Sequence, residues 1–308
     1  MAQVFTDILA SIKAKGNIEA FDVLNLRETT YRDGSAIISE AQAIMDLHKA
    51  CTIFPQYWLD FYFEATIDFV VRQQDPMGYV DEYKANWLLD NISNQGRVNS
   101  PADLELVTRI IETADDAPAA VRALALNEIE QTILSGKGAT RNGDSQSGSH
   151  INDAEVAYLR RLMFALSSGG AATISVDEAE ALFRIKNACL DGDNADAWLD
   201  FFAKTIGNHL MAHDFYTKIS VEKAQERETF LENTHSNIGA FLSRAFVGAK
   251  SAIGSADRND IWDENHGADD IAENENIDSV ENAWLNQKIA SDGKTDKYEQ
   301  AVIEVIKN

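Results

Sequence analysis

The chain has 308 residues, of which 45% are hydrophobic and 25% charged, and its formal net charge is −23 with a pI near 4.5. An excess of carboxylates of this size repels phosphate backbones and anionic lipid surfaces, so we expect neither nucleic acid nor a membrane among the partners. The sequence contains no run of about 18 apolar residues that would predict a membrane span. Its two cysteines, Cys51 and Cys189, fall on predicted apolar helix faces and form no disulfide framework, so we expect a reduced, cytoplasmic protein.

The first part of the chain predicts a unit of four helices. Apolar residues recur there at three- and four-residue spacing, which places helices near residues 18–31, 39–51, 56–72 and 80–91. Ser39 and Asp81 lie where helix N-caps are expected.

Two more helices are predicted after this unit, and two linkers follow farther along the chain. Ser100 and Pro101 predict the cap and the first residue of one helix, and Pro118 predicts the start of the next. The segment 136–150 is rich in Gly and Ser, which is typical of a flexible linker. The segment 251–276 is strongly acidic and is interpreted as a second linker.

An internal repeat is the strongest pattern in the sequence. The motif WLDF occurs at Trp58–Phe61 and again at Trp198–Phe201. The flanking residues align in order, and the aligned pairs are Ile18 with Ile151, Val23 with Val156, Leu26 with Leu159, Glu40 with Glu178, and Cys51 with Cys189. A partial third copy pairs Glu299 with Glu178. The aligned positions are mostly apolar, which predicts a shared scaffold and not a shared active site.

The sequence therefore predicts an all-α fold, because strand signals are almost absent. It consists of two homologous four-helix units with an inserted helix pair and a C-terminal helical hairpin. The predicted parts are a first unit with an N-terminal helix at 1–92, the helix pair at 93–135, a linker at 136–150, a second unit at 151–250, an acidic linker at 251–276 and the partial third repeat at 277–308.

Two short joints place Asp-Gly before a glutamate that opens a helix. The residues concerned are Asp33, Gly34 and Glu40 near the N-terminus, and Asp292, Gly293 and Glu299 near the C-terminus. They match positions 5, 6 and 12 of a calcium-binding EF-hand loop, but positions 1 and 3 of both loops lack carboxylates. The alternative is structural, since Asp-Gly is a common turn pair and a glutamate in the first helical turn complements the helix dipole.

These joints resemble EF-hand-like domains and the tellurite-resistance TerB family of acidic α-helical proteins. The resemblance implies paired helix–loop–helix units and a role in metal or stress responses. It also implies divalent-cation binding, with Ca²⁺ as the candidate ion and Asp33, Glu40, Asp292 and Glu299 as candidate ligands.

A second candidate metal site is the pair His209 and His213, which share one helix face at i and i+4 with Asp214 adjacent. A zinc site needs three or four ligands, so a surface or packing role is the alternative. An enzyme that uses these three residues is the last of three functional hypotheses.

The leading functional hypothesis is a non-catalytic cytoplasmic module that binds a protein partner, either a basic surface or an amphipathic helix. It depends on an internal repeat whose aligned positions are mostly apolar, so that no set of polar residues recurs in both copies. The aromatic-rich helices that begin with the WLDF motifs predict either a bundle core or a groove for a partner helix. The alternative is a Ca²⁺ sensor or buffer, or a TerB-like metal-binding protein.

Overall fold

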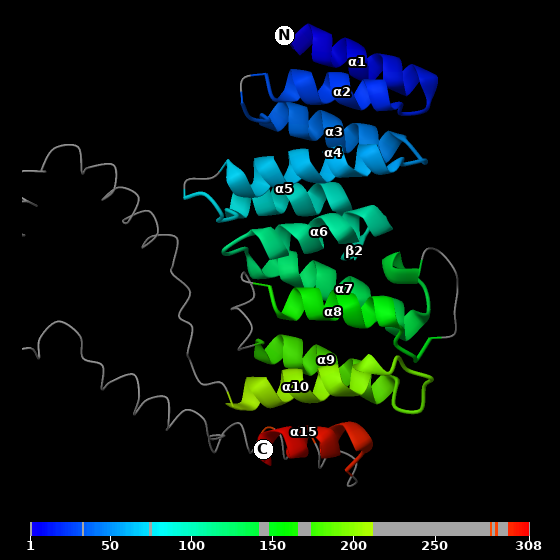
Figure 1. Cartoon of the computed structure of the whole chain (residues 1–308), viewed down its shortest axis with the longest axis vertical. Coiled ribbons are helices and arrows are strands. Elements are labelled where there is room, and N and C mark those ends of the chain that lie inside the picture. Colours follow the sequence, from blue (N-terminus) through cyan, green and yellow to red (C-terminus); the bar gives the residue numbers. More distant parts are fainter. Residues whose placement is uncertain are drawn as a thin grey trace, which may run out of the picture.

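The computed structural model describes residues 2–32, 34–73, 76–141, 148–165, 174–211, 284, 287–288 and 295–307. Figure 1 shows helices stacked one after another from α1 at one end to α10 and α15 at the other. The all-α prediction is confirmed for the described residues, whose only strands are two residues long. The helices are α1 (Ala2–Lys15), α2 (Ala20–Thr30), α3 (Ile38–Ala50), α4 (Gln56–Ile67), α5 (Glu82–Ile92), α6 (Pro101–Thr113), α7 (Ala119–Ser135), α8 (Asp153–Met163), α9 (Val176–Ala188), α10 (Ala197–Met211) and α15 (Lys297–Lys307).

The helices form two layers. One layer contains α2, α4, α6, α8, α10 and α15, each of which contacts the next in this series. Opposite it lie α1 and α3, which contact each other, followed by α5, α7 and α9. Contacts between α1 and α2, α3 and α4, α6 and α7, and α9 and α10 join the layers. Each helix thus packs mainly against its neighbours along the stack, as in solenoid proteins.

The predicted helices of the first unit are present, but one cap was predicted wrongly. Asp81 is the N-cap of α5, and its carboxylate accepts a hydrogen bond from the Lys84 N–H at 2.6 Å. Ser39, in contrast, is not a cap, because α3 already begins at Ile38 with Ile37 as its N-cap. The Glu40 side chain reaches back to the Ile37 N–H at 3.1 Å and so satisfies an exposed helix-end donor without help from Ser39.

The helix predicted at 56–72 changes its winding near its end. The α-helix α4 is continued by a π-helical turn, η1 (Asp68–Arg72), whose Phe69, Val70 and Val71 are buried. A single π turn inside a helix shifts the register of the following side chains. Here it keeps three successive apolar side chains in the core.

The inserted helix pair begins where the prolines predict and follows a small hairpin that the sequence analysis missed. Ser100 caps α6 and Pro101 is its first residue, while Pro118 is the N-cap of α7. Before α6, β1 (Ser93–Asn94) pairs antiparallel with β2 (Arg97–Val98). The turn residues Gln95 and Gly96 both have positive φ, as a two-residue hairpin turn requires. A short 3₁₀ turn, η2 (Ala139–Arg141), follows α7.

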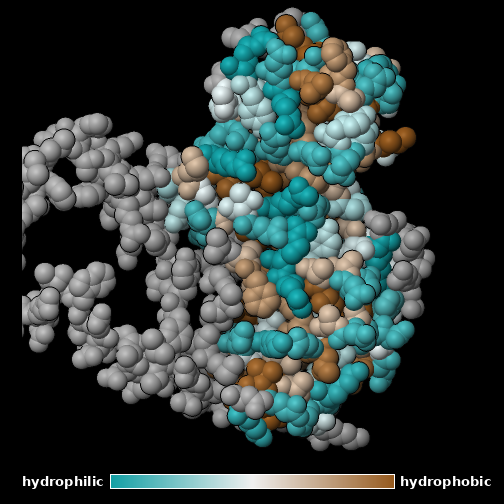
Figure 2. Space-filling view, viewed as in Figure 1, coloured by the Kyte–Doolittle hydropathy of each residue, from teal (hydrophilic) through white to brown (hydrophobic). Residues whose placement is uncertain are grey.

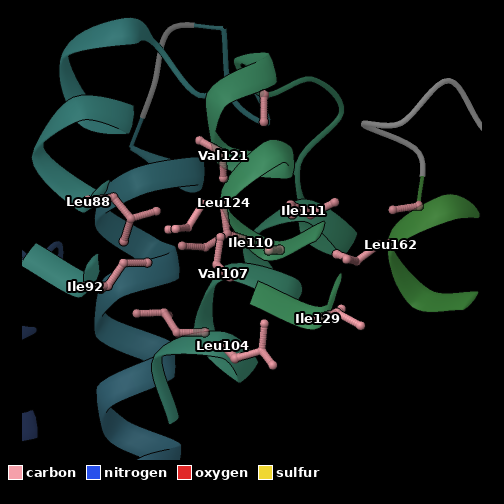
Figure 3. Packing of buried hydrophobic residues seen from close by; sticks show 14 of the residues in the cluster. Leu88, Ile92, Leu104, Val107, Ile110, Ile111, Val121, Leu124, Ile129 and Leu162 are labelled. Carbon is pink, nitrogen blue, oxygen red and sulfur yellow. The ribbon is translucent and has the colours of Figure 1, made fainter. Parts of the chain in front are cut away.

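One hydrophobic core runs through the stack. Figure 3 shows its middle, where side chains of α6 and α7 pack with Leu88 and Ile92 of α5 on one side and with Leu162 of α8 on the other. The inserted pair therefore lies in the core that joins both predicted units. Cys51 and Cys189 are free and buried, as expected for structural cysteines. No helix in the described ranges is both long enough and apolar enough to cross a membrane.

Candidate functional site

The first Asp-Gly joint contains a helix cap. Asp33 lies outside the described residues, whereas Gly34 has φ +97° and its N–H donates to the Tyr31 carbonyl at 3.1 Å. Glu40 occupies the third helical position of α3, where its carboxylate accepts the Ile37 N–H. The described half of this joint thus forms a turn and a cap.

The second joint ends in a buried ion pair. Asp292 and Gly293 lie outside the described residues. Glu299, at the third position of α15, accepts the Asp296 N–H at 3.0 Å and the Lys186 ammonium at 2.7 Å. Its side chain is almost fully buried. The Lys186 ammonium therefore occupies the position that a metal cation bound to Glu299 would need.

The repeat-aligned Glu178 has the same cap geometry. It is the third residue of α9, and its carboxylate accepts the Ser175 N–H at 2.7 Å while the Ser175 hydroxyl accepts the Glu178 N–H at 3.2 Å. Glu40, Glu178 and Glu299 therefore all accept a hydrogen bond from an N-cap N–H group, which is the second half of a capping box. Within the described ranges, no group of three or more His, Cys, Asp or Glu side chains is arranged to hold a metal ion.

The predicted histidine pair has one described member. His209 lies half-buried on α10, where its ring meets the Trp284 ring edge-to-face at 5.9 Å. His213 and Asp214 lie outside the described residues. This ring contact is a packing contact.

A buried polar cluster joins α3, α4 and α6. His48 is 5% exposed, and its ring is stacked between Phe54 and Tyr62, with centroids 4.1 and 4.0 Å away. The Trp58 indole N–H donates to His48 Nδ1 at 3.2 Å, while Nε2 has no hydrogen-bond partner and lies 4.0 Å from Asp103. Burial lowers the pKa of His48 to about 4, so the ring is neutral at pH 7.

Asp103 completes this cluster from the first turn of α6. It accepts hydrogen bonds from the Tyr62 hydroxyl at 2.8 Å and from the Ser100 hydroxyl at 2.7 Å. Burial raises the pKa of Asp103 above its ordinary value even though both hydrogen bonds act to lower it. The cluster thus holds a neutral imidazole close to a desolvated carboxyl group.

An ion pair lies at the matching place of the predicted second unit. The alignment of Cys51 with Cys189 sets His48 against Lys186, one turn before each cysteine. Lys186 is 2% exposed and donates to Asp296 at 2.6 Å and to Glu299 at 2.7 Å. Burial lowers the pKa of Lys186, but the hydrogen bonds to both carboxylates outweigh burial and raise it above its ordinary value. In both places a buried side chain near the end of a helix, α3 or α9, faces an acid in the first turn of a helix of the other layer, α6 or α15.

An arginine–aromatic contact also recurs at aligned positions. The Arg27 guanidinium lies 5.7 Å from the centre of the Phe61 ring, and the Arg160 guanidinium lies 6.0 Å from that of Phe201. Both contacts join neighbouring helices of the same layer, α2 to α4 and α8 to α10. Both are cation–π contacts, and they stabilise the packing of neighbouring helices.

One open cavity of about 470 Å³ lies beside the β-hairpin. Its Arg97 donates to Glu128 at 2.5 Å, and Glu128 also accepts the Ala139 N–H at 3.0 Å. Gly138 has φ +156°, and a Cβ there would lie 1.9 Å from the Thr132 hydroxyl, so the loop needs glycine to approach this helix. The charged groups of the cavity therefore hold the hairpin and the following loop against α7.

Large apolar side chains are exposed where α2 and α4 begin. We call this set the apolar patch, and it consists of Phe21, Leu24, Ile53 and Tyr57, with exposed fractions of 70%, 63%, 76% and 39%. The loops before α2 and before α4 lie on the same side of the stack, at the right of Figure 1, and Figure 2 shows hydrophobic side chains scattered among hydrophilic ones on the upper helices. Exposed apolar clusters of this kind mark interaction surfaces.

Sequence reasoning missed both the apolar patch and the two buried polar clusters. Phe21 and Leu24 are spaced i and i+3 on the face of α2 opposite the buried Val23 and Leu26, a signal that is readable from the helical period alone. The pairing of Lys186 with Glu299 spans 113 residues and has no local signal.

Comparison of the chain with protein-family models, with curated proteins and with solved structures finds no match.

Proposed function

We propose that this chain is a non-catalytic, cytoplasmic scaffold that binds a protein partner and is built from repeated, degenerate EF-hand-like helical units. The observation that carries the proposal is the contrast between its interior and its surface. The buried ion pair of Lys186 and the hydrogen bond from Tyr62 to Asp103 join helices inside the described part, while large apolar side chains of the apolar patch face solvent. A helical stack offers a long, continuous surface of this kind.

Agreement between aligned positions supports the repeat on which this proposal is based. Trp58 and Trp198 are both fully buried, and Leu26 and Leu159 are as well. The Arg27–Phe61 and Arg160–Phe201 contacts have nearly the same length, and the aligned glutamates all accept N-cap N–H groups. What the two copies share is therefore packing, capping and helix spacing, which favours a scaffold.

The polar clusters support a structural use of the charged residues. His48 has an indole donor on Nδ1 and lies within an aromatic stack, and Glu299 is neutralised by Lys186. A general base or a metal ligand needs a free lone pair that a substrate or ion can reach. The lone pairs of these groups are directed to partners inside the stack.

The mass of the protein isolated from cells tests the proposal. The chain is tagged at its own gene, purified from the cells that produce it, and measured by light scattering at physiological salt. We expect a particle heavier than the 34.1 kDa chain that contains a second protein in fixed stoichiometry. A particle made only of this chain would contradict the scaffold proposal.

A further inference from the structure

We propose that the apolar patch is the docking site for an amphipathic helix of a partner protein whose polar side carries basic residues. This inference rests on the proposed scaffold function and assigns it a surface and a partner chemistry. The other possible occupant of the patch is a second copy of this chain, which the test below distinguishes.

The two helices under the patch form a parallel pair. Near their starts the Tyr57 hydroxyl donates to the Ile18 carbonyl at 3.0 Å, and farther along Arg27 meets Glu64 at 2.7 Å. Phe21 and Leu24 follow each other along the exposed side of α2, and Tyr57 adds an aromatic ring from the start of α4. A partner helix that lies along this pair meets apolar side chains at about one-turn intervals, which is how helices are bound in grooves.

The side chains of the apolar patch are not repeated at the aligned positions of the second unit, so the repeated fold does not require them. At the aligned positions of α8, Ala154 and Ala157 replace Phe21 and Leu24. Ala197 replaces Tyr57, and the loop before α10 is acidic where the loop before α4 carries Ile53. The exposed large apolar side chains described in the second unit lie at other positions, namely Phe164, Val176 and Leu199, with exposed fractions of 37%, 57% and 36%. The side chains of the apolar patch are thus absent from the aligned positions, which favours a role that is specific to the first unit.

The charges around the patch favour a basic partner. The helices α2 and α4 together carry four acidic residues and one basic residue. That basic residue, Arg27, lies against Glu64 and the Phe61 ring. Glu28 follows Leu24 by one turn and Asp60 follows Tyr57 by three residues; both are exposed, and Glu28 also lies 3.8 Å from the Arg32 guanidinium. Lysine or arginine on the partner helix would meet these two carboxylates, which speeds association and sets orientation.

The size of the patch argues against a second copy. Four partly exposed side chains offer on the order of 400 Å² of apolar surface, whereas a stable dimer buries about 800 Å² on each partner. One face of a single helix is of the right size for the patch. The repulsion between two chains of charge −23 also opposes self-association through an acidic surface.

Fluorescence anisotropy with a designed peptide tests the inference. The probe is a labelled 18-residue helix with leucine on one face and lysine on the other, and its control carries glutamate in place of lysine. We expect the lysine peptide to bind the whole chain at physiological salt and the glutamate peptide to bind at least tenfold more weakly. The double variant Phe21→Ala/Leu24→Ala should weaken binding of the lysine peptide at least tenfold.

Two further variants separate the patch from general attraction to an acidic protein. The matched control Met77→Ala/Tyr83→Ala removes side chains that are about equally exposed elsewhere, and it should leave affinity unchanged. Glu28→Gln/Asp60→Asn should weaken binding about threefold and reduce its salt dependence. Circular dichroism confirms that each variant is folded.

Three results would overturn the inference. The Phe21→Ala/Leu24→Ala variant could bind the lysine peptide as tightly as the Met77→Ala/Tyr83→Ala variant, or the glutamate peptide could bind as tightly as the lysine peptide. The third is a concentration-dependent dimer in sedimentation that Phe21→Ala/Leu24→Ala abolishes, which would assign the patch to a second copy. The scaffold proposal fails separately, by the absence of a second protein in particles isolated from cells.

Discussion

Replacing Lys186 with methionine should strongly destabilise the C-terminal end of the stack. The lysine is 2% exposed and neutralises Glu299, which is equally buried, and Asp296, which is nearly so. Methionine fills similar space but leaves the two carboxylates without their cation. Removing one partner of a buried ion pair costs about 3–5 kcal/mol, because the remaining charge stays desolvated. We expect a loss in the free energy of unfolding of this size in urea denaturation at pH 7.

Two comparisons show whether the buried charge is the cause. Lys204→Met breaks an exposed pair with Asp200 on α10 and should cost less than about 0.5 kcal/mol. Adding Asp296→Asn and Glu299→Gln to Lys186→Met should recover most of the lost stability, since both unpaired charges are then gone.

The reasoning is refuted if Lys186→Met costs no more than Lys204→Met at pH 7. It is equally refuted if the triple variant is less stable than Lys186→Met, because the ion pair would then not be the source of the loss.

Three further predictions concern the matched polar positions. The folded-state pKa of His48 is about 4 and its ordinary value is 6.5, so the unfolded chain binds the proton more readily and stability falls as the pH drops from 6.5 towards 4. Between pH 7 and pH 5 the loss of stability from His48 is about 2 kcal/mol, and urea denaturation of His48→Gln should lack this loss. The raised pKa of Asp103 acts in the opposite direction, but it contributes to the wild type and to His48→Gln alike. Trp58→Phe should cost about 1–2 kcal/mol more than Trp198→Phe, because the Trp58 indole donates to His48 whereas the Trp198 indole N–H is buried with no partner among the described residues. Calorimetric titration with Ca²⁺ should give no saturable heat in the micromolar range, because Glu40 serves as a helix cap and Glu299 is paired with Lys186.

Each of these predictions has a clear contrary result. An equal pH dependence in the wild type and in His48→Gln would show that the histidine is not responsible. Equal losses of stability in Trp58→Phe and Trp198→Phe would show that the hydrogen bond from the Trp58 indole to His48 does not stabilise the fold. Micromolar Ca²⁺ heat that Glu40→Gln abolishes would place the calcium-sensor hypothesis ahead of the scaffold.

Local features of the fold could be predicted from the sequence because they depend on neighbouring residues. The three- and four-residue apolar spacing identified the helices of the first unit, and Asp81, Pro101 and Pro118 marked helix starts correctly. Ser39 failed as a cap because α3 begins one residue earlier, at Ile38, which makes Ser39 the second residue of the helix. A shift of one residue in the helix start moves a serine from the cap into the helix, and apolar spacing does not fix helix ends to one residue.

Long-range features could not be predicted, since they arise from packing between distant segments. The sequence places the helix pair α6–α7 between the two predicted units, but apolar spacing does not indicate that its side chains share a core with Leu88 of α5 and Leu162 of α8. The same holds for the contact of Asp103 with the Tyr62 hydroxyl. Which acid meets which buried partner depends on the order of helices in the stack, and helical periodicity carries no information about that order.

Site-specific photo-crosslinking in living cells tests the scaffold account most directly. A photoreactive phenylalanine analogue replaces Phe21 in the apolar patch, and Tyr83 on α5 serves as the matched exposed position. The account predicts one discrete adduct with a different protein from position 21, through a segment that is helical and basic, and none of comparable yield from position 83. An equal yield from both positions, or adducts only between copies of this chain, would contradict it.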